Sequence, residues 1–257
     1  MNSFAVVARK EILDHLRDRR AVLSSAMMAL LGPGVVLLVS LSGRTRGQES
    51  EQVLLGMLSV FALVSSFAGA IDIAMDSTAG ERERRSLCPL LLNPIPRRDV
   101  IIGKWLAVTV FALAAVAFNS LGSAVVLAWA APALLGSRAP QLLLWITLGL
   151  VPLALLGAAL SLLVAVLCRS TKEAHTALRF LVFVPMLLGM FLIFFPAWVG
   201  RAWFLLPIVG QQALIGLREP SVPVARGAIL AIVTLAAAML ALFGASRALN
   251  RDDILST

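Results

Sequence analysis

Charged residues are scarce in this chain of 257 residues, of which Asp, Glu, Lys and Arg together make up 14%. A soluble domain carries roughly 25% charged residues and about 45–50% apolar ones. Here 60% of the residues are hydrophobic, and the mean hydropathy is +0.93. This composition indicates an integral membrane protein, and no interval outside the apolar runs is large enough to bury a separate core. We therefore predict one membrane domain over residues 1–257.

Cysteine and histidine are too few for several kinds of site. The two cysteines, Cys88 and Cys168, provide neither a disulfide framework nor the ligands of a metal centre. The two histidines, His15 and His175, lie in separate charged segments, and no H-E-x-x-H motif is present. We expect no metal in this chain, and we interpret His175 as a solvated loop residue.

Motifs for nucleotide binding and for hydrolysis are also absent. No G-x-x-x-x-G-K-[ST] occurs, since the Gly103-Lys104 pair lacks the upstream glycine, and there is no G-x-S-x-G elbow. We therefore expect no ATP site in this chain, and an intramembrane enzyme fits poorly. The net charge of +8 does not indicate a nucleic-acid partner, because membrane insertion explains basic loops and no aromatic stacking platform accompanies them.

Six predominantly apolar runs are long enough to cross a bilayer. A hydrocarbon core of ~30 Å requires about 20 helical residues. The predicted spans are residues 21–43, 53–75, 101–129, 142–167, 180–197 and 227–246. Gly32-Pro33-Gly34 predicts a kink in the first span, which neighbouring helices must compensate by satisfying the freed backbone groups. The expected fold class is an all-α integral membrane protein with six transmembrane helices.

One further run, residues 202–217, is too short for a full span. Its 16 uncharged residues would cover ~24 Å as a helix. Pro207, Gly210 and the Gln211-Gln212 pair would weaken a helix that faces lipid. We expect a re-entrant or interfacial hairpin on the outer side before the last span. The alternative is a seventh span, which would place the C-terminus outside.

The distribution of basic residues predicts the orientation. Five Lys and Arg residues precede residue 21, six lie in residues 76–104, three in 168–179 and two after 244, which makes 16 of 22. Because such residues accumulate on cytoplasmic segments, we expect both termini in the cytoplasm and the chain in the cell membrane. Residues 1–20 alternate apolar and charged residues at helical spacing, which predicts an amphipathic helix at the membrane surface. A frayed basic tail is the alternative.

Polar residues inside the spans are rare, and they are the candidates for a polar path. Asp72 stands at the cytoplasmic end of the second span, and Asn119 stands within the third. Intramembrane polar groups often mark transport paths. The competing interpretations are an interfacial carboxylate paired with an arginine for Asp72 and an interhelical hydrogen bond for Asn119. We favour the competing interpretations for both residues.

Residues 76–105 form the longest polar interval, and they suggest a docking element for a soluble partner. Charged clusters at both ends enclose a short apolar run that is too short to cross a bilayer. The charges would orient an association, and the leucines would fill a groove on the partner. The candidate docking residues are Gly80, Glu81, Arg82, Glu83, Arg84, Arg85, Leu87, Leu90 and Leu91. The alternative is an ordinary charged loop with a surface helix.

The run GERERRSLCPLLLNPIPR, residues 80–97, resembles the permease subunits of type-2 ATP-binding-cassette (ABC) exporters. The order of segments extends this resemblance over essentially the whole chain, and Lys172-Glu173-Ala174 is similar to the branch related to sodium-extruding NatB permeases. The resemblance implies a homodimer or heterodimer of permeases, each on a cytoplasmic ATPase subunit that holds ATP and Mg. It further implies that residues 80–92 are a coupling helix and residues 1–20 an interface helix. Residues 202–217 would be outer re-entrant helices that gate the exit.

Two departures from the family pattern stand out. Cys88 occupies a position where the family's S/T-L-E pattern has an acidic residue, which removes one charge from the docking surface. The outer loop at residues 44–52 is short, and together with the scarcity of membrane carboxylates it does not favour sodium as the substrate. We predict the permease subunit of an exporter, with a non-transporting ABC-linked sensor or scaffold as the alternative.

Overall fold

Long helices make up the protein. The computed structural model describes residues 3–41, 48–84, 96–130, 139–195, 205–215 and 224–249, and every regular element within these ranges is helical. The long helices are α2 (Arg19–Leu41), α3 (Gln48–Met75), α6 (Arg97–Ala130), α8 (Ala139–Leu167), α9 (Thr171–Phe194) and α11 (Val224–Leu249). The shorter elements are α1 (Ser3–Arg17), the π-helical turn η1 (Asp76–Gly80), α4 (Glu81–Glu83) and α10 (Pro207–Ile215).

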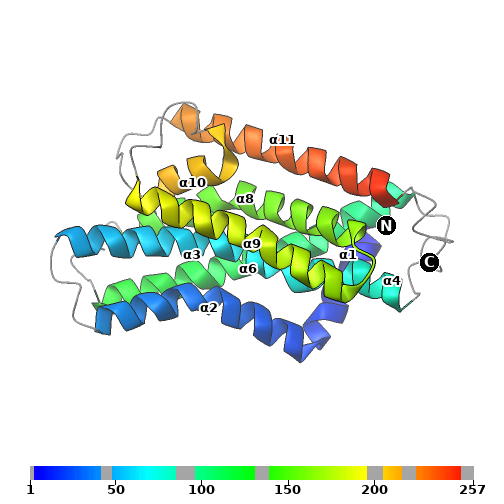
Figure 1. Ribbon diagram of the computed structural model, residues 1–257, viewed down its shortest axis with the longest axis horizontal. Coiled ribbons are helices and arrows are strands. Elements are labelled where there is room, and N and C mark those ends of the chain that lie inside the picture. The colour runs from blue at the N-terminus through cyan, green and yellow to red at the C-terminus, as the bar shows by residue number, and fades with distance from the viewer. Residues whose placement is uncertain are drawn as a thin grey trace.

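The six long helices run side by side along the long axis of the molecule (Figure 1). Each, with α3 continued through η1 and α4, contains a stretch long and apolar enough to cross a membrane. These stretches are Val22–Leu41, Gly56–Glu83, Arg97–Trp129, Gly149–Leu167, Thr171–Phe194 and Ala225–Leu249. The predicted all-α fold with six membrane spans is therefore confirmed. Successive long helices alternate in direction, so α1 and the end of α11 lie at the same end of the bundle (Figure 1).

Small residues allow the central helices to pack closely. A Cβ atom on Gly69 of α3 would lie 2.4 Å from the Cβ of Ala115 on α6. One on Gly157 of α8 would lie 2.8 Å from the carbonyl oxygen of Ser66 on α3, so this glycine permits close contact between the two helices. In the most apolar window of each helix, 72% of the positions are buried in α3, whereas 22% are buried in α2 and 22% in α9. The large apolar side chains exposed on α2 and α9 suit contact with lipid.

Asn119 compensates for the proline in the first span. Pro33 lacks an N–H, so the carbonyl oxygen of Ala29, one turn earlier, has no donor within α2. The side-chain amide of Asn119 donates to this oxygen at 3.1 Å and lies 3.5 Å from the carbonyl oxygen of Phe61 on α3. The interhelical hydrogen bond that we favoured for Asn119 is present. It joins α2, α3 and α6 at one point.

Two helix boundaries differ from the prediction because charged residues continue a helix. The second span was predicted to end at residue 75, but the helical run of α3 continues through η1 and α4 to Glu83. Residues 168–179 lie between the fourth and fifth predicted spans, and His175 was predicted to be a solvated loop residue, yet α9 begins at Thr171 and includes His175. The reason is a capping box, in which the Ser170 hydroxyl accepts from the amide of Glu173 at 3.3 Å. The Glu173 carboxylate in turn accepts from the amide of Arg169 at 2.8 Å.

The short helix α10 occupies the segment where a hairpin was predicted. Its nine residues cover about 13 Å, which is too short to cross a bilayer, so α10 is not a seventh span. Gln211 and Gln212 are buried, and the amide of Gln212 donates to the Ser59 hydroxyl of α3 at 2.7 Å. Residues 202–204 and 216–217 of the predicted hairpin lie outside the described residues.

Candidate functional site

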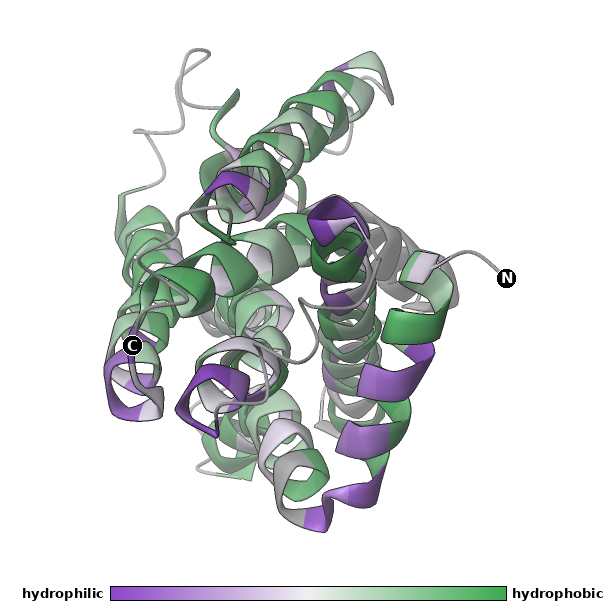
Figure 2. Cartoon of the chain, turned by 90° about the vertical axis from the view of Figure 1, so that its right-hand side faces the viewer, coloured by the Kyte–Doolittle hydropathy of each residue, from purple (hydrophilic) through white to green (hydrophobic). Residues whose placement is uncertain are grey.

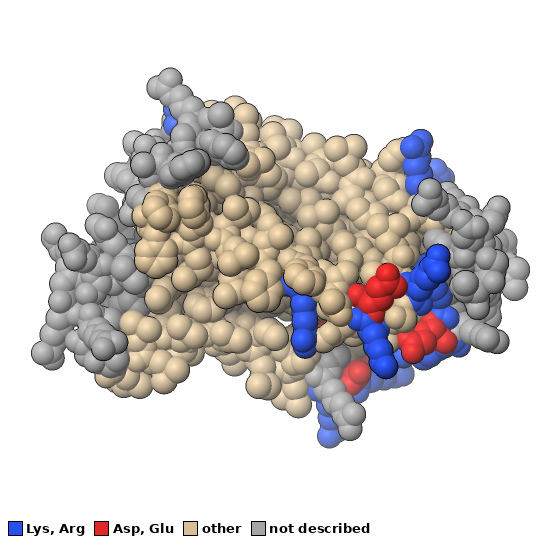
Figure 3. Space-filling view, viewed as in Figure 1, with Lys and Arg blue, Asp and Glu red and all other residues tan. Residues whose placement is uncertain are grey.

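Charged side chains gather toward one end of the bundle (Figure 3). At this end, called the polar end below, α2, α6 and α9 begin and α3, α8 and α11 finish. A helix carries a partial positive charge at its N-terminus and a partial negative charge at its C-terminus. Several side chains at the polar end meet helix ends of opposite charge. Arg97, for example, donates to the carbonyl oxygen of Leu249 at the end of α11, at 3.3 Å.

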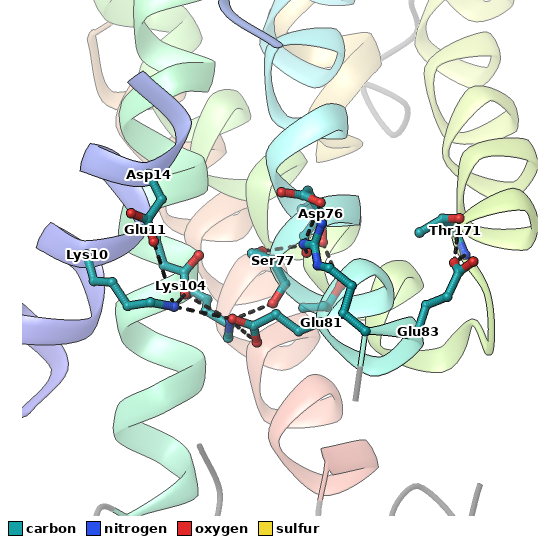
Figure 4. A network of polar contacts seen from close by, with 12 residues as sticks. Lys10, Glu11, Asp14, Asp76, Ser77, Glu81, Glu83, Lys104 and Thr171 are labelled. Atoms are coloured by element: carbon teal, nitrogen blue, oxygen red, sulfur yellow. Dashed lines mark hydrogen bonds and ion pairs between the residues drawn. The ribbon is translucent and has the colours of Figure 1, made fainter. Parts of the chain in front are cut away.

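Lys104 lies at the centre of a buried ionic cluster (Figure 4). Its ammonium group donates to Glu11 Oε1 at 3.0 Å, to Glu81 Oε2 at 2.7 Å and to the carbonyl oxygen of Ser77. These acceptors match the three donors of a lysine. Glu11 belongs to α1, Ser77 to η1 and Glu81 to α4, whereas Lys104 lies near the start of α6. The cluster thus joins segments that are far apart in the sequence.

Lys10 adds a second cation, and we call Lys10, Glu11, Glu81 and Lys104 the lysine cluster. Lys10 Nζ lies 3.5 Å from Glu11 Oε1 and 3.5 Å from Glu81 Oε1. Partial burial alone would lower the pKa of Lys10, but the carboxylates of Glu11, Glu81 and Asp14 outweigh it and raise the pKa above its usual value. The cluster balances two positive and two negative charges. This pairing offsets the free-energy cost of removing the charges of Lys104 and Glu11 from water. The two side chains are 2% and 5% exposed.

Helix α1 reaches Lys104 because a glycine precedes that residue. α1 runs across the polar end rather than along the bundle (Figure 2). The face that it buries carries Val7, Ala8, Glu11 and His15. A Cβ atom on Gly103 would lie 2.7 Å from the Phe4 carbonyl oxygen and 2.7 Å from the Val7 Cβ. Glycine at this position therefore permits the close contact that brings Glu11 to Lys104.

Arg82 and Glu83 bind the ends of two consecutive helices. The Arg82 guanidinium donates to the carbonyl oxygens of Val166 at 3.0 Å and Cys168 at 2.7 Å, at the end of α8. The Glu83 carboxylate accepts from the amide of Thr171 at 3.1 Å and from its hydroxyl at 2.6 Å, at the start of α9. Each charge is opposite to the partial charge of the helix end that it meets. The two residues therefore hold both sides of the turn between α8 and α9.

Arg84 folds back on the π-helical turn. Its Nη2 atom lies 2.7 Å from Asp76 Oδ1, and the Arg84 side chain is 60% exposed. A Cβ atom on Gly80 would lie 2.8 Å from the same carboxylate oxygen and 3.1 Å from Arg84 Nη2. Gly80 thus leaves room for this ion pair. π-Helical turns occur frequently at functional sites.

The structure describes five of the nine predicted docking residues, Gly80 to Arg84. Arg85, Leu87, Leu90 and Leu91 lie outside the described residues. Each charged side chain from Glu81 to Arg84 has a partner within the chain, and Glu81 is buried. The docking role of the nine residues stays a prediction. Of the charges described, that of Arg84 is well placed for an outside partner because its side chain is largely exposed.

The two candidates for a polar path lie apart. Asp72 accepts a hydrogen bond from the Ser24 hydroxyl of α2, and the pairing with an arginine that we favoured is not present among the side chains that the structure describes. Asn119 contacts α3 near Phe61, about 16 Å along the helix from Asp72. In the structure both residues hold α2 against its neighbours, and their role in a path stays a prediction. Within the described part of the chain, no group of His, Cys, Asp and Glu residues is placed to hold a metal ion.

Lys104 and Glu11 were not predicted as site residues. The available signal was weak: Lys104 stands three residues inside a predicted span, and Glu11 follows Val7 at the spacing of one helical turn. A charge within an apolar helical face is unusual and indicates a specific partner. The sequence alone, however, does not show which charged residue elsewhere in the chain is the partner of Lys104.

Comparison with known proteins identifies the family. Residues 5–199 match the family model described as ABC-2 family transporter protein. The chain belongs to the ABC-2 transporter family. Its relatives include the ABC transporter permease protein NatB of Bacillus subtilis (strain 168), which is 33% identical over 189 residues, 67% of this chain and 47% of the relative. The resemblance predicted from residues 80–97 and 172–174 is thereby confirmed.

A second relative of this ABC-2 family member is the probable ABC transporter permease protein NosY. The protein from Stutzerimonas stutzeri is 31% identical over 105 residues, 41% of this chain and 38% of the relative. The protein from Pseudomonas aeruginosa is 31% identical over 100 residues, 39% of this chain and 36% of the relative. The matched regions thus span about half or less of the length of these relatives.

Proposed function

We propose that this ABC-2 family member is the permease subunit of an ABC exporter. It moves substrate outward across the cell membrane, and a separate cytoplasmic ATPase subunit binds ATP and Mg and supplies the energy. Two permease copies, identical or different, pair in the membrane, with both termini of each copy in the cytoplasm. The chain binds no cofactor itself. The segment at residues 202–217 forms the outer re-entrant hairpin that gates the exit.

The observation that supports this proposal is the position of residues 80–84, the described part of the predicted docking segment at residues 80–92, at the polar end of a chain of the ABC-2 family. The first residues of this segment are attached to α1, α6, α8 and α9 by the contacts described above. A partner bound to the segment could therefore act on several membrane helices at once. No ATP-binding motif is present in the chain, so a separate ATPase is the simplest source of energy.

Co-purification with the candidate ATPase tests the proposal. Arg84→Glu and Arg85→Glu reverse charges of the docking segment, whereas Arg82 is left intact because its guanidinium holds the end of α8. We expect both substitutions to weaken association with the ATPase and to reduce its stimulation. The matched control is Arg226→Glu, an exposed arginine at the opposite end of the bundle. Equal association in all variants would show that docking does not use these arginines.

A non-transporting ABC-linked sensor or scaffold is the second candidate. The many side-chain contacts between α1, α6, α8 and the docking segment would also suit a protein that only relays a partner's state. Reconstitution with the ATPase in vesicles, followed by transport and resistance assays, separates the two candidates. ATP-dependent movement of a solute supports the exporter. Stable binding and ATPase stimulation without movement of any tested solute favour the sensor.

A further inference from the structure

The buried part of the lysine cluster connects the docking segment to the N-terminal helix. We propose that Lys104 and Glu11 are positioning residues that make α1, and with it α2, follow the docking segment when the ATPase partner acts. This inference rests on the proposed function and adds a route to it. The route runs from Glu81 through Lys104 to Glu11 on α1, and then to the first span.

The first step of the argument is the geometry of Lys104. Its ammonium group is 2.7 Å from Glu81 in α4 and 3.0 Å from Glu11 in α1, and it also binds the Ser77 carbonyl oxygen of η1. Lys104 of α6 thus binds the docking segment, the π-helical turn and α1 at the same time (Figure 4). Lys10, on α1 itself, adds a second contact with Glu81 at 3.5 Å.

The second step is burial, which distinguishes this link from the contact between Glu83 and α9. Lys104 and Glu11 are almost fully buried, so pulling them apart would leave unpaired charges away from water. Glu83, which contacts the start of α9, is exposed, and water can replace its hydrogen bonds. A displacement of the docking segment is therefore transmitted firmly to α1 and weakly to α9.

The third step leads from α1 to α2. Asp18 is the single residue between the two helices, and its amide donates to the His15 carbonyl oxygen at 3.1 Å. The amide of Val22 in α2 in turn donates to the Asp18 carbonyl oxygen at 3.1 Å. This short, hydrogen-bonded connection restricts the movement of α1 relative to α2. Buried positions make up 22% of the apolar window of α2, and a shift of this span would act on the contacts with Asp72 and Asn119 that hold it to α3 and α6.

Hydrogen–deuterium exchange on the complex of the full chain with its ATPase tests this route. Exchange in residues 3–17 is compared with and without MgATP in the wild type, in Lys104→Met and in Glu11→Gln. We expect MgATP to change exchange in α1 of the wild type, and we expect this change to be lost in both variants. Lys172→Met serves as the matched control, because Lys172 is exposed on α9, and it retains the response.

Substitution of Lys104 alone leaves two buried carboxylates and can impair folding. The double variant Glu11→Gln and Lys104→Met removes one buried charge of each sign and leaves Glu81 paired with Lys10, so it is expected to fold. It should bind the ATPase as the wild type does and show no ATP-dependent change in α1. A retained response in this variant, or no response in a wild-type complex that binds the ATPase, overturns the inference. Failure of the wild type to bind any ATPase overturns the proposed function instead.

Discussion

Asn119 supplies the hydrogen-bond donor that Pro33 removes from α2. Its amide reaches the Ala29 carbonyl oxygen at 3.1 Å, and the side chain is 1% exposed. Asn119→Leu keeps a similar side-chain volume but leaves this oxygen without its donor. We expect the free energy of unfolding to fall by about 1 kcal/mol, as is typical of hydrogen bonds between membrane helices. Equilibrium unfolding in mixed micelles measures the change.

The control for this prediction is a double-mutant cycle with Pro33→Ala. Alanine restores the N–H that α2 lacks, so the Ala29 carbonyl oxygen regains a donor within its own helix. In that background Asn119→Leu should destabilise the protein less than in the wild type. An equal loss in both backgrounds would mean that Asn119 acts through packing rather than through the proline.

Cys168 offers a test of electrostatics at the polar end. Burial raises the pKa of its thiol, Glu173 raises it further, and the nearby Arg82 opposes both effects. Because the thiolate is the reactive form, alkylation at neutral pH should be slow and should accelerate with rising pH. Glu173→Gln removes a negative charge, lowers the thiol pKa and so speeds alkylation below that pKa.

The measurement uses iodoacetamide, mass spectrometry and a Cys88→Ser background, so that one thiol reacts. Rates of the wild-type background and Glu173→Gln should converge at a pH above both pKa values, where each thiol is ionised. Asp14→Asn removes a negative charge on α1 instead and should leave the rate unchanged. A slower reaction in Glu173→Gln would show that access, rather than charge, controls Cys168.

At the scale of elements, the crossing of α3 and α6 depends on the absence of a side chain at Gly69. A Cβ atom there would lie 2.4 Å from the Ala115 Cβ and 3.1 Å from the Phe111 carbonyl oxygen. Gly69→Ala should therefore force the helices apart and destabilise the protein by about 1–3 kcal/mol. Gly34→Ala is the matched control, because a Cβ atom on Gly34 meets nothing within 4 Å. The same unfolding assay should show this control to be neutral or slightly stabilised, since alanine favours helix more than glycine does.

The number of spans could be predicted from the sequence, whereas some helix ends could not. Apolar runs of sufficient length mark the membrane helices whatever their neighbours are. The start of α9 was missed because Lys172, Glu173 and Arg179 resemble a polar loop, although Ser170 and Glu173 form a capping box. The extension of α3 was missed because its charged residues also resemble a polar loop. In the structure, contacts with other helices satisfy these charges. Composition alone does not reveal such tertiary contacts.

The position of the candidate site was easier to predict than its internal contacts. The polar interval at residues 76–105 stood out between two apolar runs. Helical spacing could not show that Glu81 turns inward to Lys104 or that Arg82 reaches the end of α8. The contact between Glu11 and Lys104 joins residues 93 positions apart, and no local pattern encodes such a pairing. The sequence therefore identified the segment but not the residues that attach it to the bundle.

At the scale of the whole molecule, the gathering of charge at one end predicts how the bundle sits in the membrane. Basic residues favour the cytoplasmic side, so the polar end should face the cytoplasm. Asp14 of α1 lies at this end with a side chain that is 53% exposed, whereas Arg226 lies at the start of α11 at the opposite end. Asp14→Cys and Arg226→Cys, each in a background with Cys88→Ser and Cys168→Ser, place single thiols at the two ends.

An impermeant maleimide applied to intact cells should label the thiol at position 226, and it should label the one at position 14 only after the membrane is permeabilised. The reversed pattern would place the docking segment outside the cell, beyond the reach of any ATPase that uses cytoplasmic ATP. Labelling of both thiols in intact cells would contradict the arrangement in which five spans lie between them. Since α1, residues 80–84 of the docking segment and the end of α11 share the polar end, one orientation assigns all of them to the same side of the membrane.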